Sequence, residues 1–494
     1  MSRYRTAGFG RWPGWRSGWQ FGGVLLVTGC LSRPLEQEEA RIGRTPITRR
    51  PVPATVAPAP GSTRADGTAG TGGAATAAAA PSAAAGAESP FPLEWGGVPR
   101  VVAGDGPLLR VALRVLPDSV TLGAAGDWRL LDAMEGVLVR ARATDRWTVQ
   151  RRGTRLRAVH ADGSVTAWHT TPMTQRAEAG APIAWNGAAY RGALQLIPTD
   201  SGILVVNLVP LEAYLRGVVP LEIGGTRGAA DEPAVEAQAI AARSYAAERL
   251  LATRAGRPRH PHYDLLATTA DQVYGGVAAE RPLSDEAVAH TAGLVLLLDG
   301  ALASAPDHSS CGGRTAAASD AWRGPGARHL QEVSDRIPGT DRHYCELAPR
   351  FAWTRTFTSS ELDAVMARYL ARYSAVGPAG PGRVTDLVID DVTTSGRVGT
   401  LVVRATGGSY RVRGVDARSL LRSAGGEALN SSYFSVAAER AEGRLTRVVL
   451  RGRGYGHGVG MCQWGAIGRA RAGQDARTIL ATYYPGTTIG PIPQ

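Results

Sequence analysis

The chain has 494 residues, a formal net charge of +12 and a pI near 10, and all 55 of its basic residues are arginine. The length allows two or three domains with a large core, and the charge favours an anionic partner such as an envelope polymer or a membrane surface. The arginines are scattered and form no basic run with interleaved aromatics, so we expect no nucleic-acid partner.

The first segment predicts export. Four arginines between positions 3 and 16 precede the apolar run FGGVLLVTG (21–29), and Cys30 follows. A basic region, an apolar region and small residues before a cleavage point are typical of a secretory signal. We therefore expect residues 1–30 to form a lipoprotein-type signal in which Cys30 is lipidated. The apolar run is too short for a membrane-spanning helix, which needs about 20 residues. An ordinary buried segment is the alternative.

The next two segments differ sharply in composition. Residues 31–92 are rich in Ala, Pro and Gly without a hydrophobic period, which predicts a disordered tether. Residues 93–206 contain short runs of alternating apolar residues separated by Gly, Asp and Asn, which predict a β-rich section. The mature protein is then expected to be lipid-anchored or secreted, at the cell envelope.

Helical patterns begin after residue 206 and give an α+β fold class. We expect a helix over 210–219 that Pro220 ends, and a long alanine-rich helix over 231–256 with Pro233 in its first turn. The remaining expected elements are strands at 294–300 and 444–452, helices near 359–373 and 475–484, and a hairpin at 384–405.

Three cysteines follow Cys30, so at most one disulfide forms among them. Cys311 and Cys345 are the favoured pair, because Cys462 lies in the glycine-rich stretch GRGYGHGVGMCQWGA (452–466). Free thiols and a zinc site are the alternatives. For zinc, His308 lies three residues before Cys311, Cys345 supplies a third ligand, and His343 is available as a fourth.

A lone carboxylate stands where the first expected helix ends. Glu222 follows Pro220 and precedes two glycines, and the apolar neighbours Val219 and Ile223 favour a raised pKa of the kind that a general acid needs. A surface glutamate is the alternative. The signatures of serine hydrolases, zinc proteases, P-loops and dinucleotide-binding folds are absent from the sequence.

Six motifs in order resemble one family. They are VPLEAYLRGVVPLEIGG, AVEAQAIAARSYA, DQVYGG, HSSCGGRT, GRGYGHGVGMCQWGA and YYPGTTI, and they span about residues 100–490. Together they are similar to the SpoIID/LytB family, named for stage II sporulation protein D and an amidase enhancer. The resemblance implies a SpoIID-type catalytic region over 207–494.

The resemblance also implies a reaction. Stage II sporulation protein D is a lytic transglycosylase on peptidoglycan strands stripped of their stem peptides, and Glu222 matches the position of the catalytic glutamate. Such an enzyme needs one carboxylate, because the C6 hydroxyl of the sugar attacks in place of water. The sequence has no obvious second catalytic carboxylate, which fits this reaction. No cofactor is required, although zinc is possible. The sugar-binding candidates are Tyr214, Arg243, Tyr245, Gln272, Tyr274, His457 and Gln463.

A second function stays open. The other half of the family name implies a non-catalytic peptidoglycan-binding protein that enhances an N-acetylmuramoyl-L-alanine amidase. The chain departs from the family pattern around the glutamate, where relatives often have a small polar residue before it and Met-Pro after it, whereas here Leu221 and Ile223-Gly224-Gly225 flank it. The sequence has no sporulation-specific feature, so a sporulation role is not carried over from the family and we expect general cell-wall remodelling.

The stretch 452–466 is expected to form a tight strand-to-helix turn, because glycine allows a close backbone approach. It should place His457 and Gln463 beside Glu222, with His457 within roughly 15 Å of it.

Overall fold

The computed structural model describes residues 106–324 and 326–493. The predicted signal with Cys30 and the predicted tether lie outside these residues. Within the described ranges, no helix is long and apolar enough to cross a membrane.

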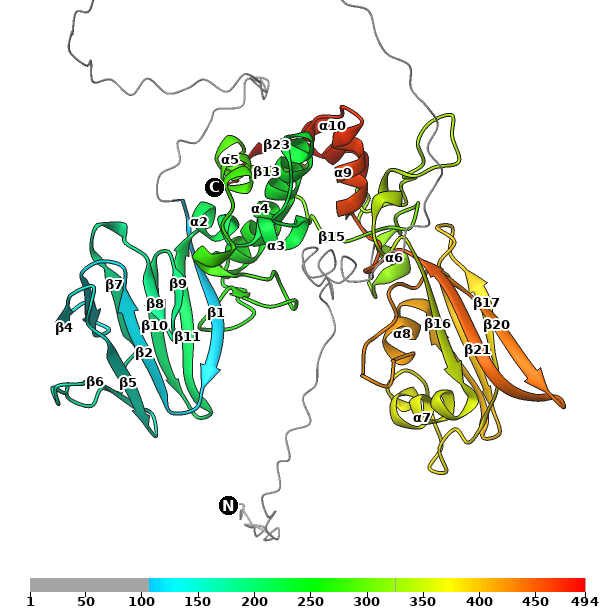
Figure 1. The fold of residues 1–494 in the computed structure, drawn as a ribbon, viewed down its shortest axis with the longest axis horizontal. Coiled ribbons are helices and arrows are strands. Elements are labelled where there is room, and N and C mark those ends of the chain that lie inside the picture. The colour runs from blue at the N-terminus through cyan, green and yellow to red at the C-terminus, as the bar shows by residue number, and fades with distance from the viewer. Residues whose placement is uncertain (1–105, 325, 494) are drawn as a thin grey trace, which may run out of the picture.

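Two β-sheets form the N-terminal part of the described chain (Figure 1). The seven-stranded sheet has the order β12-β1-β11-β10-β7-β3-β4, and the five-stranded sheet has the order β6-β5-β2-β8-β9. Alternate side chains such as Val120 and Leu122 of β2 are buried in the shared core, as a half-buried strand requires. The elements are β1 (Leu108–Leu116), β2 (Ser119–Ala124), β3 (Trp128–Leu131), β4 (Val137–Ala141), β5 (Trp147–Arg152), β6 (Arg155–His160), β7 (Met173–Ala177), η1 (Glu178–Gly180), β8 (Ile183–Trp185), β9 (Ala188–Tyr190), β10 (Ala193–Thr199), β11 (Gly202–Pro210) and β12 (Leu265–Leu266).

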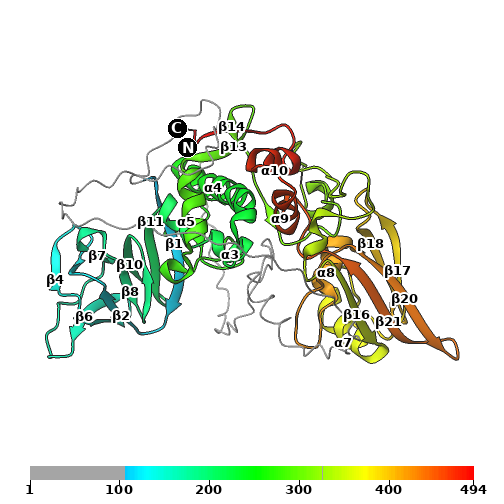
Figure 2. The same ribbon diagram turned by 45° about the horizontal axis from the view of Figure 1, so that its top comes forward.

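A helical body follows and is built around one long helix, α4 (Glu232–Arg254). Its alanines are small enough for α3, α5, α9 and α10 to pack closely around it, and most of its residues are buried. Figure 2 shows α9 and α10 between α4 and the yellow-to-orange residues 352–453, with the N-terminal sheets on the other side of α4. The other elements of the body are α2 (Leu211–Arg216), α3 (Val219–Ile223), η2 (Ala229–Asp231), η3 (Gly276–Ala279), α5 (Pro282–His290), β13 (Leu294–Leu298), β14 (Ala301–Leu302), β15 (Asp307–His308), α6 (Ala318–Ala321), η4 (Tyr344–Leu347), β22 (Met461–Cys462), α9 (Gln463–Arg471), α10 (Ala476–Tyr483) and β23 (Thr488–Pro491).

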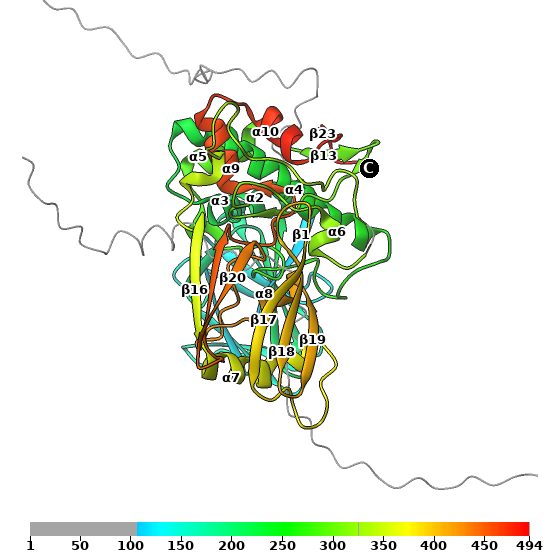
Figure 3. The same ribbon diagram turned by 90° about the vertical axis from the view of Figure 1, so that its right-hand side faces the viewer.

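A second β-lobe, residues 352–453, has a core of its own (Figure 3). Its two three-stranded sheets have the orders β16-β21-β20 and β17-β18-β19, and α7 and α8 pack against them. Thr358 caps α7 and exchanges hydrogen bonds with Glu361, which fixes the start of that helix. The elements are β16 (Ala352–Thr358), α7 (Ser359–Tyr369), η5 (Leu370–Arg372), β17 (Val384–Val392), β18 (Val398–Ala405), β19 (Gly408–Arg413), α8 (Gly414–Leu420), β20 (Phe434–Ala441) and β21 (Arg444–Arg453).

The second lobe is inserted into the helical body through two neighbouring segments. Ala352 at the start of β16 pairs with Arg453 at the end of β21. One residue outside this pair, Gly454 N donates to Phe351 O at 2.8 Å. The chain therefore leaves the body and returns to it at one place.

The α+β class and the β-rich N-terminal section are confirmed. One detail of the helical prediction was wrong. The first helix ends at Arg216, and Pro220 lies in the first turn of a second helix, α3, which contains Glu222. Proline is well tolerated there, because the first-turn N–H groups of a helix have no intrahelical acceptor.

Candidate active site

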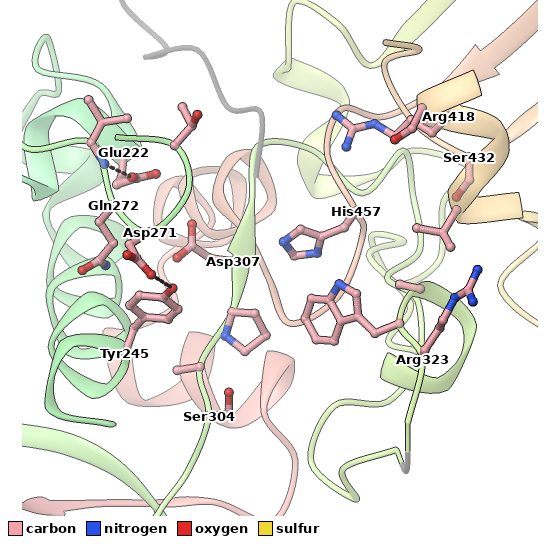
Figure 4. Close-up of a pocket in the computed structure, with 18 of the residues that line it drawn as sticks. Glu222, Tyr245, Asp271, Gln272, Ser304, Asp307, Arg323, Arg418, Ser432 and His457 are labelled. Atoms are coloured by element: carbon pink, nitrogen blue, oxygen red, sulfur yellow. Dashed lines mark hydrogen bonds between the residues drawn. The ribbon is translucent and has the colours of Figure 1, made fainter. Parts of the chain in front are cut away.

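A cavity of about 760 Å³ lies between the helical body and the second lobe. In Figure 4, Glu222, Gln272 and Tyr245 lie on the wall formed by the body, and Arg418, Ser432 and Arg323 lie on the opposite wall. Asp307 and His457 lie between the two walls. The cavity therefore gathers residues from distant parts of the sequence.

Glu222 lies on α3 and is half-buried at the cavity wall. Gly224, with φ near 97°, ends this short helix. One carboxylate oxygen, Oε1, accepts from Val273 N at 3.4 Å, and Oε2 accepts from Gln463 Nε2 at 3.5 Å. These two donors fix the carboxyl group without fully enclosing it, so it stays available to a ligand in the cavity.

A second carboxylate, Asp307, lies beside Glu222, and the sequence analysis did not identify it. Its Oδ1 accepts from Gln463 Nε2 at 2.8 Å, and its Oδ2 accepts from Gln238 Nε2 at 3.2 Å. The same Gln463 amide thus contacts both acids. The sequence offered one signal for Asp307, namely its place directly before His308 in the motif HSSCGGRT.

The pKa values of both carboxyl groups are higher than those of exposed carboxyl groups. Burial, and then the charge of Asp307, raise the pKa of Glu222 to about 8. Burial also raises the pKa of Asp307 to about 6. At neutral pH the lower-pKa acid, Asp307, is ionised while Glu222 keeps its proton, so the pair offers one acid and one negative charge.

The glycine-rich stretch connects β21 to β22 and α9, which is the predicted strand-to-helix turn. Gly454, Gly456, Gly458 and Gly460 all have φ between 71° and 114°. A Cβ at Gly460 would lie 2.0 Å from the carbonyl oxygen of Pro306. The backbone therefore approaches the segment before Asp307 more closely than any other residue type allows.

His457 of this stretch lines the same cavity as Glu222. Its ring centroid lies 5.2 Å from that of Trp322 and 5.5 Å from that of His308. Its Nδ1 accepts from Val459 N at 3.0 Å, and the side chain also hydrogen-bonds to the Asp307 backbone. Burial, and then the neighbouring His308, hold the pKa of His457 well below its usual value, so the ring is neutral. Its one donor and its one acceptor are both used within the protein, so the ring offers a ligand its face.

Tyr245 and Gln272 lie on the wall of the helical body. The Tyr245 hydroxyl donates to Asp271 Oδ1 at 2.8 Å, and Asp271 Oδ2 in turn accepts from Leu266 N at 2.9 Å. Gln272 accepts from the Tyr214 hydroxyl at 3.2 Å. An aromatic face and planar amides beside a carboxyl group are well suited to a carbohydrate.

Four of the predicted sugar-binding residues lie behind the wall instead: the fully buried Gln463, whose amide contacts both acids, and Tyr214, Arg243 and Tyr274. Tyr214 is fully buried, and its ring centroid lies 5.0 Å from that of Tyr274. The Tyr274 hydroxyl donates to Asn207 Oδ1 at 2.9 Å. Arg243 is fully buried and donates to both oxygens of Glu212, at 2.9 and 2.7 Å. The polar groups of Tyr214, Arg243 and Tyr274 are paired within the protein, and none of the four side chains lines the cavity. They therefore support the wall from behind.

The predicted cysteine pair comes together, but not as a disulfide. Cys311, Cys345 and Cys462 are free thiols, and the Sγ atoms of Cys311 and Cys345 are 3.4 Å apart. Cys462 and Asp335 join them in one group. His308 and His343 lie outside this group, and His308 Nδ1 instead pairs with Val459 O at 3.1 Å.

Comparisons with known proteins agree with these motifs. Residues 199–298 match the family model SpoIID, described as stage II sporulation protein, and residues 328–460 match a domain of unknown function. The first match contains Glu222 and Gln272, and the second contains the whole of the second β-lobe.

The chain is also similar to whole curated proteins. It is 29% identical to an uncharacterized protein of Brachyspira hyodysenteriae, over 62% of this chain and 73% of that protein. It is 28% identical to the amidase enhancer of Bacillus subtilis, over 56% of this chain and 40% of that protein. It is 28% identical to stage II sporulation protein D of the same organism, over 66% of this chain and 84% of that protein.

Proposed function

We propose that this chain, which belongs to the SpoIID family, is a peptidoglycan lytic transglycosylase in which Glu222 is the general acid and base. The family and its cell-wall character are the premise, and the cleavage of glycan strands is the proposal. The observation that carries it is a carboxyl group with a pKa near 8 on the wall of a large cavity. Such a group keeps its proton at neutral pH, as a general acid must.

The reaction needs two proton transfers through the same group. Protonated Glu222 donates to the glycosidic oxygen as the bond to the anomeric carbon breaks. The carboxylate that results then accepts the proton of the C6 hydroxyl as that oxygen attacks the anomeric carbon. One bond breaks, one forms, no water is consumed, and the product ends in a 1,6-anhydro ring while Glu222 is protonated again.

Asp307 has a supporting part in this scheme. Its negative charge raises the pKa of Glu222 and stabilises the positive charge that develops on the sugar in the transition state. Gln463 holds the two acids at a fixed separation through one amide nitrogen. Tyr245, Gln272 and His457 supply the ring faces and hydrogen-bonding groups that bind the strand.

A carboxylate pair is also what a hydrolase uses, so the product decides between the two reactions. The experiment incubates the purified protein with glycan strands stripped of stem peptides and measures the released sugars by mass spectrometry. We expect anhydro-ended products from the wild type and none from Glu222→Gln. Products heavier by one water, with a free reducing end, would show hydrolysis and refute the transglycosylase.

The second candidate function is a non-catalytic wall-binding protein that enhances an amidase. The observation that favours it is the similarity to the amidase enhancer of Bacillus subtilis, of which the chain covers 40%. It predicts that wild type and Glu222→Gln bind glycan strands equally, release no product, and both accelerate an N-acetylmuramoyl-L-alanine amidase. Glycan release by the wild type alone excludes this function as the sole one.

The proposed location follows from the substrate. Peptidoglycan lies outside the cytoplasmic membrane, so we propose an envelope protein that is anchored through lipidated Cys30 or secreted. The net charge of +12 suits the anionic polymers of that compartment. Radiolabelled fatty acid should enter the wild type and not Cys30→Ser. Incorporation into both forms would exclude Cys30 as the anchor.

A further inference from the structure

Three thiols and one carboxylate meet in the interior beside the candidate active site. Cys311 follows β15, Asp335 precedes η4, Cys345 lies on η4, and Cys462 ends β22. Their sulfur atoms and a carboxylate oxygen all lie within 4.8 Å of one another, and all four residues are buried. The four groups therefore come from three separate segments of the chain.

We propose that Cys311, Asp335, Cys345 and Cys462 form a structural site for one thiophilic divalent cation, of which zinc is the prime candidate. Zinc prefers four ligands in a tetrahedron, with zinc–sulfur bonds of about 2.3 Å, which places neighbouring sulfurs about 3.8 Å apart. The Cys311 and Cys345 sulfurs are 3.4 Å apart, and the Cys311 sulfur is 3.6 Å from Asp335 Oδ2. Contraction or expansion by a few tenths of an ångström brings these atoms to that geometry.

The surroundings of the ligand atoms are those of a metal site. Cys462 Sγ accepts from two backbone amides, Cys311 N at 3.1 Å and Gly465 N at 3.2 Å. A neutral thiol is a weak acceptor, whereas a metal-bound thiolate is a strong one. Asp335 directs Oδ2 at the thiols, while its Oδ1 accepts from the Tyr483 hydroxyl at 2.7 Å. Such outer hydrogen bonds orient the ligands of protein-bound metals.

The charges of the four proposed ligands and of the two nearby arginines also sum to zero when a divalent cation is bound. Three thiolates and a carboxylate around a divalent ion leave two negative charges. Arg469 NH2 lies 3.2 Å from Asp335 Oδ1, and the buried Arg397 donates to the Cys311 carbonyl at 2.9 Å. These two guanidinium groups neutralise the remainder, which a buried cluster requires.

A disulfide between Cys311 and Cys345 explains less of this arrangement. It would not explain why the Cys462 sulfur, the Asp335 carboxylate and two buried arginines also gather at this place. All four coordination positions come from the protein, so the ion has no open position for a substrate and its role is structural. It would tie β22, and with it the adjacent Gln463, to the loop after β15.

The test measures metal content, which does not depend on glycan cleavage, so its failure leaves the proposed function standing. The full chain is produced with supplemented zinc, purified without chelator, and analysed by elemental mass spectrometry. We expect one zinc per wild-type chain, less than a tenth of that in Cys311→Ser and Cys462→Ser, and a full complement in the matched control Cys30→Ser. Tyr483→Phe should keep the stoichiometry and weaken zinc binding by roughly tenfold.

A second measurement uses only the wild type, so it does not depend on whether the variants fold. After chelation and addition of cobalt(II), we expect the ultraviolet charge-transfer absorption of thiolate–cobalt bonds and the visible bands of a tetrahedral ion. A metal-free protein with a Cys311–Cys345 linked peptide, a metal-free protein with three reactive thiols, or zinc retained by both serine variants would each overturn the proposal.

Discussion

The Asp307→Asn variant should move the alkaline limit of activity downward. In the proposed reaction the acid form of Glu222 is the active one, so wild-type activity should fall by half as the pH rises to about 8, the pKa of that group. Asp307 opposes ionisation of Glu222 because a second negative charge nearby disfavours the first. The amide removes this charge, keeps the shape of the side chain, and leaves burial as the main cause of the raised pKa.

The expected shift in the pKa of Glu222 can be worked out from the Gln463 amide that contacts both acids. Gln463 Nε2 lies 3.5 Å from Glu222 Oε2 and 2.8 Å from Asp307 Oδ1, so these oxygens lie within roughly 6 Å of one another. At an effective dielectric constant of about 20, two charges at that distance repel by about 2.8 kcal/mol, or about two pH units. The alkaline limit should therefore fall from about 8 to about 6.

The assay follows anhydro-product release from stripped glycan strands between pH 5 and 10, under conditions where wild type stays folded. Asp416→Asn is the matched control, because Asp416 lines the same cavity but pairs with Arg323 on the other wall. It should leave the limit unchanged. An alkaline limit of Asp307→Asn that stays within half a unit of wild type, or rises, would refute the coupling between the two acids.

Three further predictions concern the same region and the helix behind it. Gln463→Leu should raise the alkaline limit by about one unit in the same assay, because it removes a hydrogen bond that lowers the pKa of Glu222; a lower limit would contradict this. Gly460→Ala should lower the free energy of unfolding in urea by more than about 3 kcal/mol, because its Cβ would meet a carbonyl oxygen. The control Gly473→Ala, also at positive φ but in open space, should lower it by about 1 kcal/mol. Equal losses would refute the close approach at Gly460. Glu236→Gln should raise the free energy of unfolding at pH 9 by roughly 4 to 5 kcal/mol and leave it unchanged at pH 4. Burial raises the pKa of Glu236 from 4.5 to about 8, so the folded wild type loses stability as the pH rises from 4.5 through 8, and the uncharged amide does not. A gain at pH 4 would contradict the sign.

The sequence predicted those features that depend on neighbouring residues. The long helix α4 follows from its alanines, from Pro233 in its first turn and from Gly256 just beyond its end. The position of Glu222 came from a motif. A motif lies directly after Asp307, but it does not place Asp307 beside Glu222. That position depends on the pairing of β15 with β22, in which Asp307 pairs with Met461, far away in the sequence.

Long-range pairing also explains why the separate core of the second lobe and the buried positions of some predicted sugar-binding residues were not predicted. The strands of the second lobe alternate as expected, but its separate core arises only when β16 pairs with β21. Arg243 and Tyr274 have polar groups that suit a sugar, yet Glu212 and Asn207 satisfy them in the interior. Residue type alone cannot show whether a polar group is already paired, because the partner comes from another segment.

The paired ends of the second lobe have an evolutionary consequence. An insertion whose two ends lie side by side can be lengthened, shortened or replaced without moving the elements that flank it. Glu222, Asp307 and Gln463 all belong to the helical body, whereas Arg418 and Ser432 on the opposite wall belong to the insertion. A lineage can therefore replace one wall of the cavity while inheriting the carboxyl pair, and with it the proposed proton chemistry, unchanged.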